Sequence, residues 1–161
     1  MTPGSLRIAV NERSIDLMMV GGAEWSIPVG PQSLVERELE RATRPAPEQL
    51  TNALGIVIDH LDDVVRESPM VMDAPSVTVT GDLVVMLARV ELGADAMPDG
   101  YRLQRADADE VFRTLVAEPI DERIHNPGLD ASHVELIIGT CCATLAIMRR
   151  LELTSIGIEA G

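Results

Sequence analysis

Aromatic residues are scarce in this sequence. They make up 2% of the 161 residues, with one each of Trp, Tyr and Phe. Few rings are therefore available to stack on bases or sugars. The hydrophobic fraction is nevertheless 46%, which predicts a core built from Val, Leu, Ile, Met and Ala. A chain of this length is expected to form a single domain over residues 1–161.

Basic residues and cysteines are also few. The chain carries 13 Lys and Arg against 26 Asp and Glu, which gives a net charge of −13. This charge repels nucleic acid, anionic membrane surfaces and polyphosphate at long range, so we expect no nucleic-acid partner. The only cysteines, Cys141 and Cys142, are adjacent in an aliphatic run, too close for an ordinary disulfide and unlike a zinc-ligand spacing. They fit core packing and a reducing compartment.

Signals for secretion and membrane insertion are absent from the sequence. Residues 1–4 lack a basic segment followed by an apolar one, and no apolar run reaches membrane-spanning length. We therefore expect a cytoplasmic protein that makes no membrane contact.

Short aliphatic and β-branched segments predict the strands. Residues 6–10, 15–20 and 24–29 are expected to form a three-strand meander. Residues 76–80 and 155–159 are expected to form two later strands. The first turn of the meander holds four polar residues and no glycine.

Prolines and apolar periodicity predict the helices. Pro31 suits the first turn of a helix that carries Leu34, Val35 and Leu39. Between residues 48 and 67, apolar positions recur every three or four residues, which predicts the clearest amphipathic helix of the chain. Three further helices are expected. One covers residues 82–90 with Asp82 as its N-cap, and one covers residues 107–115 with Asp107 or Asp109 as its N-cap. The third covers residues 133–151 with Asp130 or Ser132 as its N-cap.

The order of these elements predicts an α/β fold. A three-strand meander followed by helix-connected strands is the order of the ribonuclease-H-like fold, which the actin-like ATPase superfamily shares. In that fold the later strands pair in parallel beside the first strand.

Several segments carry a resemblance to a known family. The stretch from Asp121 to Gly139 has an arginine, a proline–glycine–leucine run and then an apolar helix, and residues 26–34 and 77–87 have a strand, a glycine and a helix start. In this order they resemble the second, C-terminal actin-like domain of the Ppx/GppA exopolyphosphatase and guanosine pentaphosphate phosphatase family. The resemblance covers almost the whole chain. The family's first domain, which supplies another phosphate loop and the catalytic glutamate, has no counterpart here.

The first hairpin departs from the family pattern. The family reads aspartate, isoleucine, three glycines, serine, threonine and glutamate where this chain has residues 9–16. Ala9 replaces the aspartate, and only Ser14 is retained; the glycine positions hold Asn11, Glu12 and Arg13. Glycines let backbone N–H groups converge on a phosphate, and side chains obstruct this. Glu12 also adds negative charge beside an anionic ligand.

The second loop has changed as well. Gly81, Asp82 and Leu83 stand where the family has small residues followed by threonine, and Asp82 has the wrong charge for an anion. The resemblance therefore implies degenerate phosphate-loop positions at Asn11, Glu12, Arg13, Ser14, Gly81 and Asp82. We expect no catalytic residue, no metal site and no cofactor in this chain, with Mg²⁺ required only if residual hydrolase activity exists.

A few polar residues remain as candidates. Arg13 and Ser14 are the best candidates for anion contact, but an exposed polar hairpin is the favoured explanation, because turns favour such residues regardless of ligand. Arg123 occupies a recurring position of the family pattern, and we expect an internal ion pair there. His125 and His133 lack recognisable partners, and we expect structural roles for both.

One acidic cluster invites a metal-site interpretation. Asp59, His60, Asp62 and Asp63 lie within the helix predicted for residues 48–67. Asp59 and Asp63 share a face, but His60 and Asp62 point elsewhere. We therefore interpret the cluster as a solvated helix surface.

Three functions remain open on this sequence. The first is a non-catalytic, degenerate Ppx/GppA-like domain that acts by association, as a homodimer or with a full-length family member. The second is a residual hydrolase or binder of polyphosphate or guanosine pentaphosphate, completed by a separate first domain. The third is a small-ligand sensor with a pocket unrelated to phosphate.

Overall fold

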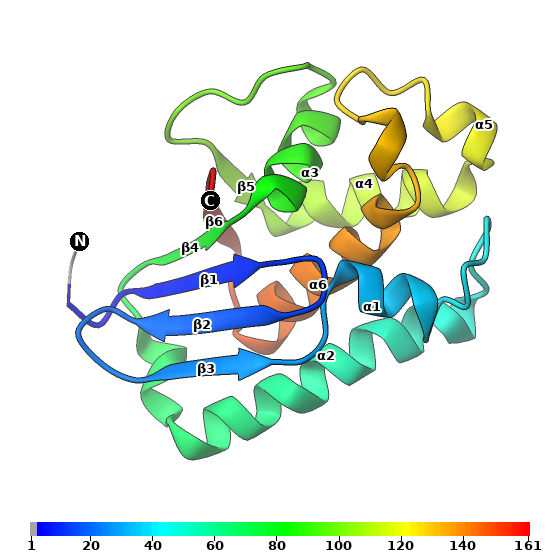
Figure 1. Ribbon diagram of the computed structural model, residues 1–161. Helices are drawn as coiled ribbons and strands as arrows, with labels where there is room; N and C mark the ends of the chain where they lie inside the picture. The colour runs from blue at the N-terminus through cyan, green and yellow to red at the C-terminus, as the bar shows by residue number, and fades with distance from the viewer. Residues whose placement is uncertain (1–2) are drawn as a thin grey trace.

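A computed structural model describes residues 3–161 and contains one six-stranded mixed sheet. The strand order across the sheet is β3-β2-β1-β4-β6-β5 (Figure 1). The strands are β1 (Leu6–Val10), β2 (Ile15–Met19), β3 (Glu24–Ile27), β4 (Val77–Thr80), β5 (Arg102–Gln104) and β6 (Ser155–Glu159). The α-helices are α1 (Pro31–Glu36), α2 (Pro47–Glu67), α3 (Asp82–Leu92), α4 (Arg105–Ala117), α5 (Ile120–Arg123) and α6 (Leu136–Arg150).

The strand pairing confirms the predicted α/β fold. β1, β2 and β3 form an antiparallel meander, β4 pairs in parallel with β1, and β6 pairs in parallel with β4. This is the ribonuclease-H-like arrangement that the element order predicts. Sequence reasoning missed β5, which pairs antiparallel with β6. With three residues, it is too short to show a period-2 pattern.

The predicted helix caps were wrong. Gly81 precedes α3, which begins at Asp82 itself and runs to Leu92. Gln104 precedes α4, so neither proposed aspartate caps that helix. The last long helix begins at Leu136, after a separate 3₁₀ turn over Ala131–His133, and no side chain caps it. The strands and turns that precede these helices determine where each helix starts. The position of a nearby acidic residue therefore does not identify the N-cap.

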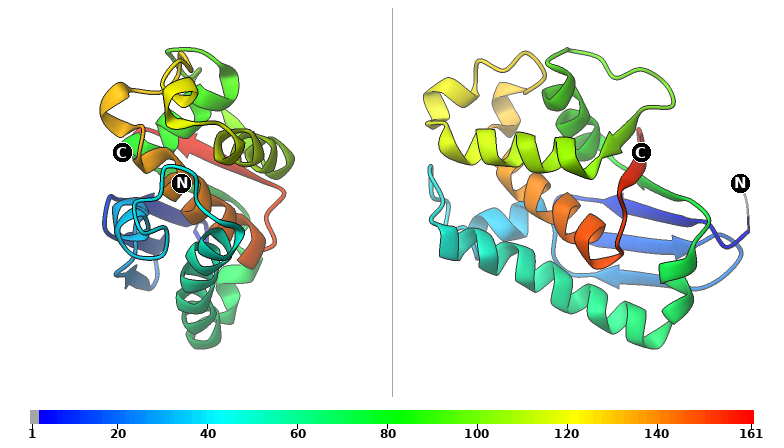
Figure 2. Two further views of the ribbon diagram at one scale, coloured as in Figure 1. Left: turned by 90° about the vertical axis from the view of Figure 1, so that its right-hand side faces the viewer. Right: turned by 180° about the vertical axis from the view of Figure 1, so that it is seen from behind.

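The core lies on one side of the sheet. Leu6, Ile8 and Val10 of β1 are buried, and they alternate with Arg7 and Ala9, which are partly exposed. The same alternation runs through β2 and through residues 77–79 of β4 in register, so one sheet face is apolar. Helix α6 packs behind this face and contacts α1, α2, α3 and α4 (Figure 2).

Helix α6 supplies much of the core. Every residue from Leu136 to Met148 is buried, which includes Cys141 and Cys142. The expectation that the two cysteines pack in the core is confirmed. No helix within residues 3–161 has the length and apolar character needed to cross a membrane.

Candidate functional site

A hollow of about 360 Å³ lies at the carboxyl ends of β1 and β4. The β1–β2 hairpin contributes Asn11 and Glu12 to its lining, and the turn before α3 contributes Gly81 and Asp82. The structure thus brings together the two loops that the sequence comparison marks as degenerate phosphate loops. Because carboxyl ends of parallel strands are the usual ligand side of an open α/β sheet, this hollow is the candidate functional site.

The hairpin backbone is anchored against the start of α1. The carbonyl oxygen of Glu12 accepts a hydrogen bond from the Gln32 N–H at 2.7 Å. A Cβ added to Gly30 would lie 2.5 Å from that oxygen and 2.6 Å from the carbonyl oxygen of Asn11. Glycine at position 30 is therefore required by close backbone packing. A hairpin held this way serves as a structural support of α1.

The glycine of the second loop also has a structural reason. Gly81 has a φ of +126°, and a Cβ at this position would lie 2.7 Å from the carbonyl oxygen of Val10. Its N–H donates to the carbonyl oxygen of Glu159 at 3.2 Å. The turn therefore ties β1, β4 and β6 together, and this glycine is needed without any ligand.

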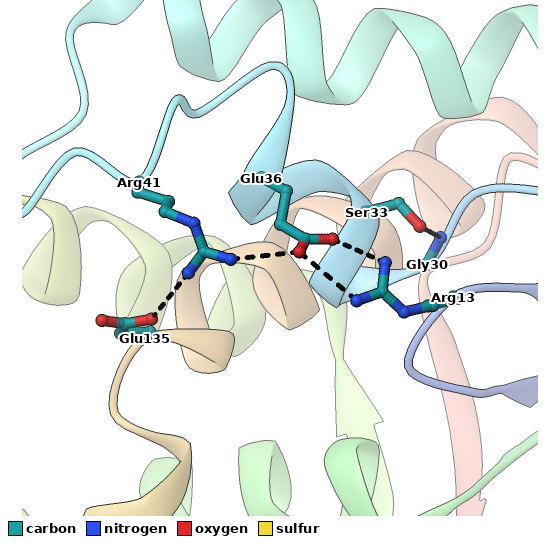
Figure 3. A network of polar contacts seen from close by, with 6 residues as sticks. All are labelled: Arg13, Gly30, Ser33, Glu36, Arg41 and Glu135. Carbon is teal, nitrogen blue, oxygen red and sulfur yellow. Dashed lines mark hydrogen bonds and ion pairs between the residues drawn. The ribbon is translucent and has the colours of Figure 1, made fainter.

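Arg13 does not line the hollow, and its side chain points toward Glu36 of α1 (Figure 3). Its guanidinium forms an ion pair with Glu36 of α1, with N–O distances of 2.5 and 3.3 Å. Arg41 contacts the same carboxylate at 3.0 Å and Glu135 at 3.6 Å, so the chain of contacts links the hairpin, α1 and the residue before α6. The hydrogen bond from Arg13 lowers the pKa of Glu36, and the same bond raises the pKa of Arg13. Sequence spacing gives no sign of this network, because its members lie far apart in the chain.

Ser14 belongs to a second polar cluster. Its hydroxyl accepts a hydrogen bond from the side-chain amide of Asn11 at 3.1 Å. The same amide donates to Asp16 at 2.9 Å, and the hydroxyl of Ser26 donates to Asp16 at 2.6 Å. Neither Ser14 nor Arg13 lines the hollow, and their contact with an anion stays a prediction.

The charges in the hollow disfavour a phosphate ligand. Glu12 and Asp82 both line it, and the basic side chain in the lining is His133. The Nδ1 atom of His133 lies 3.7 Å from Asp130, whose carboxylate also contacts Arg89 at 3.3 Å. Two carboxylates without a matching guanidinium or ammonium repel an anion.

The residues present do not fit the Mg²⁺ ion that the family resemblance implies. Within residues 3–161, no group of three or more His, Cys, Asp or Glu side chains is arranged to hold a metal ion. In α2, Asp62 pairs with Arg150 and Asp63 pairs with Arg66. Ala9 supplies no oxygen ligand where the family pattern has an aspartate.

Arg123 is buried without the ion pair that we predicted. Its side chain is 2% exposed, and one terminal nitrogen donates to the carbonyl oxygens of Thr43, Leu115 and Glu118 at 3.1, 3.2 and 3.3 Å. Burial lowers the pKa of the guanidinium. The prediction was wrong because carbonyl groups at the C-terminal end of α4 and in the loop before α2 accept the guanidinium N–H groups in place of a carboxylate. His125, by contrast, is exposed just after α5.

Comparisons with known proteins agree with this architecture. No family model and no curated protein matches the sequence. Among solved structures, an exopolyphosphatase-like protein superimposes with a TM-score of 0.85 and 17% identity, over 98% of this chain and 56% of that chain. The chain has the fold of Ppx/GppA structures.

Two further neighbours extend the comparison. The type II variant of the Aquifex aeolicus Ppx/GppA phosphatase gives a TM-score of 0.84 at 15% identity, over 97% of this chain and 53% of that chain. An exopolyphosphatase from Cytophaga hutchinsonii gives 0.73 at 14% identity, over 97% and 53%. The chain thus spans about half the length of these neighbours, consistent with one of their domains. The fold that the resemblance implied is confirmed.

Proposed function

We propose that this chain is a degenerate, non-catalytic Ppx/GppA-like domain that acts by binding another protein. The observation that carries the proposal is the pair of carboxylates, Glu12 and Asp82, which line the hollow where both phosphate loops of the resembling family would meet. An anion placed there would meet like charge from both sides.

Three further observations support the loss of phosphate binding. The hairpin backbone packs on Gly30, and its Glu12 carbonyl oxygen accepts the Gln32 N–H, so the hairpin is fixed against α1. Arg13 is engaged by Glu36 outside the hollow. Ala9 offers neither a metal ligand nor a base. The domain keeps its fold but lacks the phosphate-binding residues of its two loops. Association with another chain is the function that such a domain still supports.

A direct assay tests the absence of chemistry. We expect no phosphate release when the purified chain is incubated with polyphosphate or guanosine pentaphosphate and Mg²⁺, and no saturable rise in Tm with either ligand. A full-length exopolyphosphatase in the same buffer serves as the positive control. Phosphate release above a blank, or a saturable Tm shift, would overturn the proposal.

A matched variant separates charge from shape. The double substitution Glu12→Gln and Asp82→Asn removes both carboxylates and keeps the side-chain size. We expect no ligand-induced Tm shift in this variant either, because the hairpin backbone stays bound to Gln32 and packed on Gly30. Binding gained by the double variant would show that charge alone closes the site.

A second function is favoured by one observation. The hollow between the two loops remains open, and the structural neighbours have about twice the matched length. In this second function a separate first domain completes a hydrolase of polyphosphate or guanosine pentaphosphate, with Mg²⁺ as its cofactor. Adding an isolated first domain of a full-length family member tests this. Phosphate release above that of the first domain alone would favour the hydrolase.

A further inference from the structure

Within residues 3–161, one face of the sheet has no helix packed on it. In Figure 1 the strands β1, β2 and β3 lie in front of α2 and α6. The right-hand view of Figure 2, turned by 180°, shows the same two helices in front of the strands. Side chains on the forward face therefore contact solvent where their neighbours in the strand are buried. Met18 is 38% exposed there, although Leu17 and Met19 beside it are 1% and 6% exposed.

The strand register lines up six residues of this face in one row, which we call the open row. Glu24 is paired with Met18, Met18 with Arg7, and Arg7 with Thr78. Thr78 is paired with Gly157, and Gly157 with Arg102. The row thus crosses the sheet from β3 to β5, with an acidic residue at one end and a basic residue at the other.

We propose that the open row is the centre of a symmetric interface with a second copy of this chain. A two-fold axis parallel to the strands, midway between β1 and β4, places β3 over β5 of the second copy and β2 over β6. Glu24 then faces Arg102 of the second copy at both ends of the row, since the contact repeats by symmetry. This inference rests on the proposed association function and names its partner.

Side-chain size matches across the same axis. Met18 lies opposite Gly157 of the second copy, so the most exposed apolar side chain of the row meets a position without a side chain. Under this axis the exposed side chain of Arg102 lies over the second copy's hollow of about 590 Å³ on β1, β2 and β3, which Glu24, Met18 and Arg7 line in part. Two sheets that pack face to face at roughly 10 Å with nearly aligned strands bring such pairs into contact.

The neighbouring row is acidic, but each of its carboxylates has a polar partner within its own chain. It places Asp16 opposite Glu159 of the second copy. Glu159 is held by Arg7 of its own chain at 3.2 Å, and Asp16 accepts hydrogen bonds from Asn11 and Ser26. These contacts reduce the repulsion between the two carboxylates.

The size of the sheet limits the surface that the dimer can bury. Six strands spaced by about 4.8 Å, with four or five residues each at about 3.3 Å, form a face of roughly 24 by 15 Å. This is about half the area that one partner contributes to an interface of standard size. We therefore expect a reversible dimer with a dissociation constant in the micromolar range.

Sedimentation velocity on the full chain tests the proposal. A concentration series from roughly 5 to 500 μM covers the dissociation constants expected for a small interface. We expect a monomer–dimer equilibrium in the wild type. Met18→Asp is expected to weaken the dimer by at least about tenfold, because it places a carboxylate in the desolvated centre. Met70→Asp is the matched control, since Met70 is 62% exposed in the turn after α2, away from the open row.

Charge exchange tests the symmetry. Glu24→Arg and Arg102→Glu are each expected to weaken self-association by about fivefold or more, because like charges then face each other at both ends. Mixing the two variants is expected to restore the dimer, because each Arg again faces a Glu in the heterodimer. Glu67→Arg, an exposed site at the end of α2, is expected to change nothing.

The outcomes separate this inference from the proposed function. A monomer at every concentration, or a dimer that is insensitive to Met18→Asp and to charge exchange, would overturn the open-row interface. Binding of a full-length family phosphatase to the open row in preference to a second copy would also overturn it. None of these results would restore phosphate chemistry, which the phosphate-release and Tm assays measure separately on the same protein.

Discussion

Gly30 precedes α1 and packs against the β1–β2 hairpin. A Cβ added to Gly30 would lie only 2.5 to 2.7 Å from three backbone atoms of that hairpin. Gly30→Ala is therefore expected to destabilise the protein by about 1–3 kcal/mol, as overpacking of a rigid contact does. Gly55→Ala is the matched control, because nothing lies within 4 Å of its Cβ position. Gly55 is inside α2, so alanine there is expected to stabilise by roughly 0.5–1 kcal/mol. Urea unfolding of the two variants measures both changes, and equal effects would contradict the close packing at Gly30.

Arg123 is the buried cation of the molecule's described part, and its role is to satisfy carbonyl groups. Arg123→Met is expected to destabilise by about 2–4 kcal/mol, because it removes the guanidinium donor from three buried or part-buried carbonyl oxygens, of which that of Leu115 keeps the Glu118 N–H as a second donor. Arg113→Met serves as the control, since that side chain is 71% exposed in an ion pair with Glu110. Its expected effect is below about 0.5 kcal/mol. Similar unfolding midpoints for both variants would show that the carbonyl contacts contribute little.

At the scale of elements, Glu36 connects the β1–β2 hairpin to α1 through Arg13. Its pKa in the folded protein is lowered from the ordinary value of 4.5. The contribution to stability is therefore present above this value and is lost as the pH falls through the lowered folded pKa. Glu36→Gln is expected to lower Tm at pH 7, and the difference from the wild type is expected to shrink as the pH drops below about 4.5.

A pH series of thermal melts measures this effect. Glu67→Gln at the exposed end of α2 provides the control, and it is expected to change Tm little at either pH. A Glu36→Gln difference that stays constant from pH 7 to strongly acidic pH would contradict a role for the carboxylate charge.

The elements also show how far local sequence reasoning reaches. Strands β1, β2, β4 and β6 and helix α2 were predicted within one or two residues, because their apolar periods are clear. The aspartate N-caps predicted for α3 and α4 were wrong, because Gly81 and Gln104 precede these helices. The starts themselves were close, since α3 begins at Asp82 and α4 begins at Arg105, two residues before Asp107. β5 was missed, since its only buried side chain is Leu103.

At the scale of the whole molecule, α6 places both cysteines in the centre of the core. Cys141 and Cys142 are 1% and 0% exposed, and burial raises the pKa of the Cys142 thiol to about 12. Thiol reagents at pH 8 are therefore expected to react only as fast as the protein unfolds. Counting modified thiols by mass spectrometry, with a sample in guanidinium chloride as the control, tests this. Rapid labelling of the native protein would contradict the central position of α6.

The candidate site illustrates a different limit. The family resemblance placed Asn11, Glu12, Gly81 and Asp82 in two loops, and the structure brings these four residues to one hollow. It grouped Arg13 and Ser14 with them, but their side chains make contacts elsewhere. The Arg13 side chain is directed by Glu36, and the Ser14 side chain by Asn11. Glu36 lies more than twenty residues from Arg13 in the chain, so local sequence does not reveal this contact.

The sequence by itself determined the aliphatic core, the order of most elements, the fold and the absence of a glycine-rich hairpin, because each of these follows from local residue type and periodicity. Only the tertiary structure decided that one face of the sheet stays open, that Glu12 and Asp82 share a hollow, and that Arg123 binds carbonyl groups. These features depend on contacts between residues that are distant in the chain, and the register of the sheet and the packing of α6 fix those contacts.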